Sequence, residues 1–208
     1  MTKQGNLGIA SVVILISFIL LAMTAFSVLS DDTTNSTSEE EIQEMIDDSL
    51  EEITKYIQIT DKIGKFYGPP NQQKIQKIAI MIKPIFSNEI DVSDITIKIT
   101  NGNTIKILSY SGFAQPVDTY HLFEHPIWNN ITENTFSLIA THDKDNSISN
   151  FNVLNKNTDM AYIIINLPSD YYMKKGDTII LQFLLSSGII KTMDLEAPLP
   201  MRSIASFD

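Results

Sequence analysis

The hydrophobic pattern of the chain changes along its length, and each change predicts a different kind of element. Residues 9–29 are apolar or small, with no charged side chain among them. A helix of this length, rising about 1.5 Å per residue, spans a hydrocarbon core of about 30 Å. The segment is longer than the roughly 7–15 apolar residues of a secretory signal peptide. The pattern therefore predicts a membrane-length helix.

A second helix of a different kind is predicted over residues 38–52. Ser38 and Glu41 have the spacing of a capping box, in which each side chain caps the backbone of the other residue. The apolar residues that follow recur at helical spacing and predict a single apolar stripe. They are Ile42, Met45, Ile46, Leu50 and Ile53. Because residues 31–54 hold acidic side chains and neither lysine nor arginine, the rest of this helix is acidic.

From residue 55 onward apolar and polar residues alternate, which is the period of a half-buried strand. Strands are expected at residues 57–63, 78–82, 95–99, 105–107, 136–140, 162–165, 179–185 and 190–195. Asn101-Gly102, between two of these strands, is a strong hairpin signal. The polar stretch over residues 111–133 is expected to be a loop or an excursion at the edge of a sheet. Short strands at this spacing predict two packed antiparallel sheets.

The fold class expected is therefore α+β. A long N-terminal hydrophobic helix would be followed by an all-β immunoglobulin-like sandwich head. The chain is long enough for one such domain with a real core.

The charge balance removes some classes of partner. The formal net charge is −10. Nucleic acid is excluded as a partner because phosphate binding needs a basic face, and an anionic membrane surface is disfavoured for the same reason. The chain has no cysteine, so disulfides play no part in the fold. An acidic surface favours solubility outside the cell and the recruitment of cations.

The first thirty residues carry a resemblance to a known family. Lys3-Gln4-Gly5 precedes Asn6-Leu7-Gly8-Ile9 and the apolar run of residues 10–19. This order resembles the leader and first helix of type IV pilin-like proteins, and most closely the archaeal flagellins, the filament subunits of the archaellum. Many pilins have Glu at the fifth mature position, where this chain has Ala10. Residues 77–82 and 90–93 look like the first strands and turn of the flagellin head.

The resemblance implies a processing site and a division of the chain. A prepilin-type leader peptidase would cut after Lys3-Gln4-Gly5, so that residues 1–5 are a leader and Asn6 is the mature amino terminus. Residues 6–53 would be a helical assembly arm, and residues 54–208 the β-sandwich head. The arms of many copies would pack in the filament core through Gly8, Ile9, Val12, Val13, Ile16, Phe18, Ile19, Leu20, Met23 and Phe26.

The resemblance also implies partners and a location. The subunit would wait in the membrane before assembly and then join identical or paralogous subunits in an extracellular cell-surface filament used for swimming. A separate archaellum motor and assembly platform would supply torque and energy. The family has no active site, and we expect no enzymatic activity.

The sharpest catalytic pattern is His121-Leu122-Phe123-Glu124-His125, which matches the H-x-x-E-H signature of one class of zinc peptidases. A zinc site here needs an α-helix that brings both histidines onto one face, with Glu124 as the base. Pro126 disfavours a helical backbone at His125. A chance match in a loop is the preferred interpretation.

Two further patterns concern ions and glycans. Asp143, Asp145 and Asn146 place oxygen ligands close together, as a calcium loop would, although the central Gly and distal Glu of an EF-hand are missing. A solvated turn is the alternative. Asn35 and Asn130 each begin an N-x-[ST] sequon in a stretch expected to be exposed. Archaeal flagellins are often glycosylated, so the resemblance favours glycans at both.

The last expectation concerns charge contacts between neighbouring copies. Six lysines lie close together on the first two strands, namely Lys55, Lys62, Lys65, Lys74, Lys77 and Lys83. We hypothesise that this basic edge of one head meets the acidic segment of a neighbouring copy; a solvated acidic face is the alternative. Three rival functions remain: an archaeal adhesion pilin, a membrane-tethered binding module that never polymerises, and a tethered zinc hydrolase.

Overall fold

The computed structural model describes residues 16–23, 43, 45, 56–69, 72–117, 121–186, 188–199 and 202–207. The chain divides into two compact units, Met1–Asp47 and Asp48–Asp208. In the first unit the described residues 16–23, Gln43 and Met45 are helical. The remaining residues of the two predicted helices lie outside the described part. Within the described residues, no helix reaches the length and apolarity that crossing a membrane requires.

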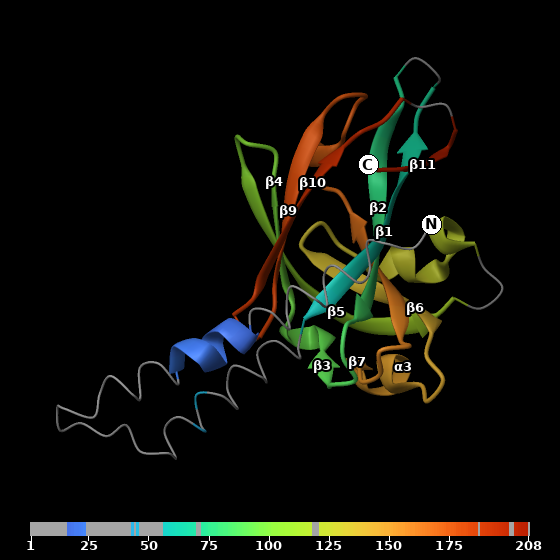
Figure 1. The fold of residues 1–208 in the computed structure, drawn as a ribbon. Helices are drawn as coiled ribbons and strands as arrows, with labels where there is room; N and C mark the ends of the chain where they lie inside the picture. Colours follow the sequence, from blue (N-terminus) through green and yellow to red (C-terminus); the bar gives the residue numbers. More distant parts are fainter. Residues whose placement is uncertain are drawn as a thin grey trace, which may run out of the picture. The chain divides into compact units, whose positions relative to one another are not determined.

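The second unit is built mainly of strands (Figure 1). These are β1 (Ile57–Tyr67), β2 (Lys74–Pro84), β3 (Ile90–Asp91), β4 (Thr96–Thr100), β5 (Ile105–Pro116), β6 (Thr135–His142), β7 (Val153–Leu154), β8 (Met160–Asn166), β9 (Thr178–Leu184), β10 (Ile190–Glu196) and β11 (Ile204–Ser206). The helical pieces among its described residues are the 3-10 turns η1 (Val92–Asp94), η2 (Leu122–Glu124), η3 (Pro126–Asn130) and η4 (Ser169–Tyr171), and the short helix α3 (Ser147–Phe151).

The long strand β5 joins two halves of one sheet, whose described strands run in the order β10-β9-β4-β5-β6-β8-β2-β1-β11. Its first part pairs antiparallel with β4, with Ile97 opposite Leu108. Its second part pairs parallel with β6, with Ser109 opposite Thr135. The sheet folds over itself at this strand into a sandwich-like half-barrel (Figure 1).

The main core lies between the two halves. Alternate residues of each strand point inward, as the period-two pattern requires. On one half these are isoleucines such as Ile78, Ile80 and Ile163, and on the other they include Ile97 and Phe183, all fully buried. One continuous apolar cluster therefore holds the halves together.

A second, smaller cluster lies on the opposite face of the β6-β8-β2-β1 half. The segment carrying η2 and η3 covers this face and contributes Phe123, Ile127 and Trp128. Trp128 Nε1 donates to the Leu122 carbonyl at 2.7 Å. Asn166 Nδ2 donates to the carbonyls of Trp128 and Ile131, each at 3.2 Å. The cover is thus hydrogen-bonded to β8 as well as packed on it.

Most of the predicted strands are present, and the differences have physical reasons. The Asn101-Gly102 hairpin is confirmed: Asn101 Oδ1 accepts from the Asn103 and Thr104 amides, and Gly102 takes φ +87°. The expectation of a loop or an edge excursion over residues 111–133 is wrong in part, because β5 continues to Pro116 between β4 and β6, and η2 and η3 follow. The parallel β5–β6 pair also departs from the expected purely antiparallel sheets.

Candidate functional site

Several large apolar side chains of the helical residues 16–23 are exposed to solvent. Phe18 is 70% exposed and Leu21 69%, and Ile19 and Leu20 are exposed as well. Exposed contiguous apolar side chains mark a protein or membrane contact. Five predicted filament-core residues lie here: Ile16, Phe18, Ile19, Leu20 and Met23. The others (Gly8, Ile9, Val12, Val13 and Phe26), the processing residues Lys3, Gly5 and Asn6, and the sequon at Asn35 lie outside the described residues.

An acidic cluster forms where the loop after β6 meets the turn before β8. Ligand oxygens of Asp143, Asp145 and Asp159 all lie within 4.8 Å of one another. Asn146, the third predicted ligand, has a left-handed backbone with φ 58° at the start of α3, and its role as a ligand stays a prediction. Sequence reasoning missed Asp159 because a lone acid before an apolar strand looks like an ordinary turn residue.

Hydrogen bonds hold the three carboxylates in different ways. Asp143 Oδ2 accepts from the Ile148 and Ser149 amides and so caps α3. Asp159 Oδ2 accepts from the Asn155 and Lys156 amides at 3.0 and 2.9 Å. Asp159 is fully buried, and its Oδ1 has no hydrogen-bond partner. A buried carboxylate oxygen without a partner is costly.

Asp145 lies at the exposed rim of the cluster. Its Oδ2 accepts from Lys156 Nζ at 2.5 Å and from Asn155 Nδ2 at 3.1 Å. The hydrogen bond from Lys156, followed by that from Asn155, holds the pKa of Asp145 well below its usual range. The same contact raises the pKa of Lys156. Carboxylate oxygens are the ligands that a hard cation such as Ca²⁺ prefers. Because Asp159 Oδ1 is buried and has no hydrogen-bond partner, it fits a ligand role.

The two histidines of the H-x-x-E-H pattern differ in burial and in hydrogen bonding. His121 is exposed and precedes η2, a 3-10 turn of three residues. His125 is buried, with its Nε2 3.1 Å from the Pro116 carbonyl and its Nδ1 accepting from the Ile127 amide at 3.2 Å. Both ring nitrogens of His125 are thus bonded to backbone. The backbone is not the α-helix that the zinc motif needs, and we assign His125 a structural role.

The predicted basic edge is divided by the structure. Lys65 lies directly opposite Lys77, and Tyr67 directly opposite Lys74. Lys62 is opposite the core residue Ile80, which puts it on the other face of the sheet. Lys83 lies opposite Gln58 toward the far end of the strand pair, and Lys55 is outside the described residues.

Asn130 of the second sequon is exposed at the end of η3. Thr132, the sequon hydroxyl residue, is also exposed, and its Oγ1 is 3.0 Å from Thr135 Oγ1. The geometry leaves the Asn130 amide accessible to a modifying enzyme.

These features define a structural class: a β-sandwich-like head with an exposed apolar helical segment ahead of it in the chain. The family model for archaeal-type flagellin matches residues 5–194. The chain therefore belongs to the archaeal-type flagellin family, which is a family of structural proteins and not of enzymes.

Known relatives agree with the family match. Flagellin B3 of Methanocaldococcus jannaschii is 28% identical over 172 residues, which cover 80% of this chain and 77% of that one. The crystal structure of archaeal flagellin FlaB1 from the same organism superimposes with a TM-score of 0.62 at 18% identity, over 73% of this chain and 95% of that one. The structure of the archaeal flagellum of Methanospirillum hungatei strain JF1 gives a TM-score of 0.50 at 12% identity. The match covers 96% of this chain and 98% of that one.

Proposed function

We propose that this flagellin assembles through its N-terminal segment into the filament of an archaeal flagellum. It is a structural filament subunit for swimming motility, and its place is outside the cell. The observation that carries the proposal is the extent of the family match, which begins at Gly5 and runs through the apolar segment and the head.

In this proposal a leader peptidase cuts between Gly5 and Asn6 after the precursor has entered the membrane through residues 9–29. Residues 6–53 then form a helical arm, and residues 54–208 form the head. Leaving lipid for a bundle of like helices gains little hydrophobic energy, because both surroundings are apolar. Close packing of the arms and contacts between heads must therefore drive assembly, while a separate motor and assembly platform supply energy.

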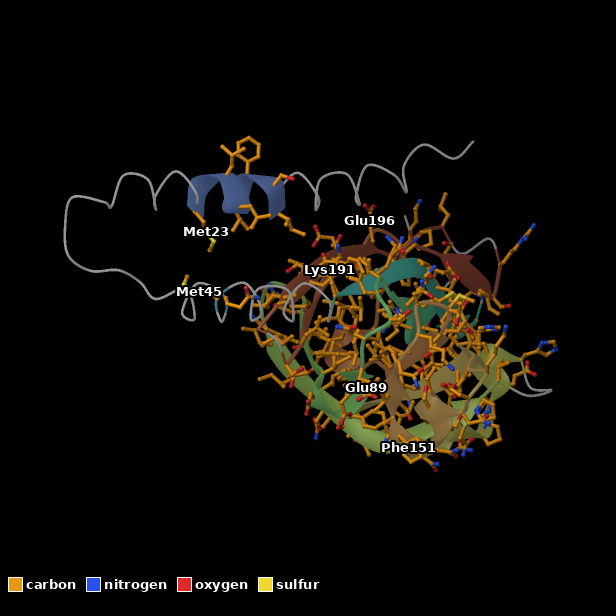
Figure 2. The ribbon with its side chains drawn as sticks, turned by 60° about the horizontal axis from the view of Figure 1, so that its bottom comes forward. Met23, Met45, Glu89, Phe151, Lys191 and Glu196 are labelled. Carbon is orange, nitrogen blue, oxygen red and sulfur yellow. The ribbon has the colours of Figure 1, made fainter. Side chains whose placement is uncertain are left out.

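A single polar substitution in the arm tests the packing. Phe18→Asp buries a carboxylate among neighbouring arms, so filaments are lost from the sheared cell-surface fraction and swimming stops. The matched control is Phe151→Asp, because Phe151 is also 69% exposed but lies on the head (Figure 2). The control strain keeps its filaments. Filaments of normal length in the Phe18→Asp strain would contradict packing through the arm.

The main rival is an adhesion pilin with the same arm. In a strain lacking this chain we expect swimming to fail while attachment to surfaces persists. The reverse outcome, with swimming intact and attachment lost, would favour the rival.

A cation site in the head is a second proposal, supported by the buried Asp159 Oδ1 that lacks a hydrogen-bond partner. Asp143, Asp145 and Asp159 would hold Ca²⁺, which would link the β6–α3 loop to the start of β8. Saturating Ca²⁺ at 100 times its Kd would stabilise the head by about 2.7 kcal/mol. Thermal unfolding with Ca²⁺ or a chelator measures this gain.

The matched variants are Asp159→Asn, which removes a ligand charge, and Asp194→Asn on the exposed side of β10. We expect Asp159→Asn to abolish the calcium-dependent rise in Tm and Asp194→Asn to retain it. An equal rise in both variants would contradict the site.

Glycans on Asn35 and Asn130 belong to the same proposal, since both sequons would face the surface of the filament. Asn130 is exposed in the head.

A further inference from the structure

Three lysines gather at one end of the β1–β2 pair, beside the cover formed by η2 and η3. Lys65 is directly opposite Lys77, and Lys74 is directly opposite Tyr67, with the Phe66–Ile75 pair between them. We call these three residues the lysine surface. Like charges directly opposite on neighbouring strands are destabilising, so their juxtaposition needs a physical explanation.

Aromatic rings hold the two opposed ammonium groups. Lys77 Nζ lies 4.7 Å from the centre of the Trp128 ring and 5.8 Å from that of Tyr67. Lys65 Nζ lies 5.6 Å from the Tyr67 ring and 5.9 Å from the Phe123 ring. Phe123 and Trp128 stack at 5.6 Å. Cation–π contacts of this kind are attractive and restrict the positions of the two ammonium groups.

The rings order the lysines without neutralising them. Lys156 and Asp145 form an ion pair between described residues, and neither residue belongs to the lysine surface. Burial, and then the neighbouring Lys65, lower the pKa of Lys77. Burial, and then the charge of Glu124, raise the pKa of Tyr67, so one acid lies near the three lysines. The lysine surface thus keeps an excess of positive charge.

The compensating charge is concentrated in another part of the same chain. Residues 55–208 hold 14 basic and 15 acidic residues, so the head is nearly neutral. Residues 1–54 hold one basic and 10 acidic residues, so the first part of the chain carries almost all of the net charge of −10. The acids run from Asp31 to Glu52 with no base among them. Copies packed through their arms would bring these acids within a Debye length of about 10 Å, where they repel.

We propose that the lysine surface of one head binds the acidic segment, residues 39–52, of a second copy in the filament. This inference rests on the proposed function, since it needs copies assembled side by side. Preordered lysines reduce the side-chain entropy lost on binding, and opposite charges set the register between copies. An anionic membrane is a poorer partner, because it would repel the rest of this acidic chain.

Zero-length cross-linking of intact filaments with a carbodiimide tests the contact directly. The reagent joins an amine to a carboxylate only where the two touch. We expect a cross-linked dimer whose peptides join Lys65, Lys74 or Lys77 to an acid in residues 39–52. Dimers without this linkage, or the linkage only within single chains, would overturn the inference.

Charge variants supply the second test. A double variant with Lys65→Gln and Lys77→Gln loses two charge contacts per subunit. We expect it to lower the yield of sheared filaments about tenfold. Lys65→Arg with Lys77→Arg keeps the charge and the ring contacts and retains filaments. The matched control is Lys174→Gln with Lys175→Gln, two exposed lysines before β9. Thermal unfolding of each purified variant separates a loss of assembly from a loss of folding.

A charge swap makes the test reciprocal. Lys65→Glu with Lys77→Glu abolishes filaments, and adding Glu44→Lys with Glu51→Lys restores them. If wild-type filaments form and the glutamine variant forms them equally well, the inference is wrong while the proposed function stands. If the wild-type chain is itself absent from filaments, the proposed function fails first. Protection of the lysines by anionic lipid vesicles alone would assign the surface to the membrane and overturn the inference.

Discussion

At the scale of single residues, Gly64 on β1 determines whether the end of the described chain can pack. A Cβ at Gly64 would lie 2.9 Å from Ile75 Cγ2 and 2.9 Å from Phe207 Cζ. Phe207 is buried there, and β11 pairs with β1 across Gly64 and Ala205. A glycine in a strand commonly marks a close approach of this kind.

Gly64→Ala is therefore expected to destabilise the head by about 1–3 kcal/mol through overpacking. A chain of this size loses about 2–4 °C in Tm per kcal/mol. Phe207→Ala opens the space, so the double variant should be less destabilised than the sum of the two single variants. Strictly additive losses in urea unfolding would contradict the assigned contact.

Tyr162 on β8 gives a residue-scale prediction about pH. Burial, followed by its 3.1 Å hydrogen bond to Asp61, raises the pKa of Tyr162 to about 12. An unfolded tyrosine titrates near 10. Because the folded pKa is the higher one, the stabilisation is complete below pH 10 and is lost as the pH rises toward 12.

We expect the free energy of unfolding of the wild type to fall more steeply between pH 10 and 12 than that of Tyr162→Phe. Urea unfolding across this range, followed by circular dichroism, measures both slopes. Tyr110, whose pKa is also raised by burial, remains in both proteins and so cancels in the comparison. Equal slopes would mean that Tyr162 does not contribute.

At the scale of elements, the sequence predicted the strands whose pattern is local. Isoleucines at every second position located β2 and β4, because one face of each must enter the core. Short apolar runs located β8 and β9. The short strand β11 was missed, since its pairing depends on Phe207 filling the space over the distant Gly64. The second part of β5 was also missed, because its polar residues are held by β6 and by a bulge at Gly112.

For the candidate sites too, residues close together in sequence were predicted, and residues brought together by the fold were missed. Asp143 and Asp145 are neighbours in sequence and were predicted, whereas Asp159 joins them only through the fold. The six lysines were predicted as one basic edge, but strand register placed Lys62 on the opposite face. Strand register and contacts between distant segments cannot be predicted from the local pattern of a single sequence.

The cover carrying η2 and η3 provides a prediction at this scale. Trp128 is the only tryptophan in the sequence and reports on the cover alone. Asn166→Ala removes both side-chain hydrogen bonds to the cover, at a cost of about 1–3 kcal/mol. We expect a red-shifted Trp128 fluorescence and faster hydrogen exchange in residues 122–131, with exchange in β2 unchanged.

Asn150→Ala is the control, since Asn150 is an exposed residue of α3. It should leave the fluorescence and the exchange of the cover as they are in the wild type. Identical spectra for Asn166→Ala and the wild type would show that packing alone holds the cover.

At the scale of the whole molecule, the first part of the chain and the head differ in charge and in exposed apolar surface. The first part carries exposed apolar residues and nearly all of the net charge, while the head is a nearly neutral β structure with its own core. In the proposed assembly, such a subunit would join copies through its arm and present its head to solvent. The lysine surface gives the head a means of setting the register of that packing.

The most direct test of this account is the amino terminus and intact mass of the protein recovered from sheared cell-surface filaments. We expect a chain that begins at Asn6, with any excess mass located on Asn35 or Asn130. Such a result would demonstrate leader removal and assembly in one sample. A chain that begins at Met1 or Thr2, or the absence of the protein from the filament fraction, would contradict the account.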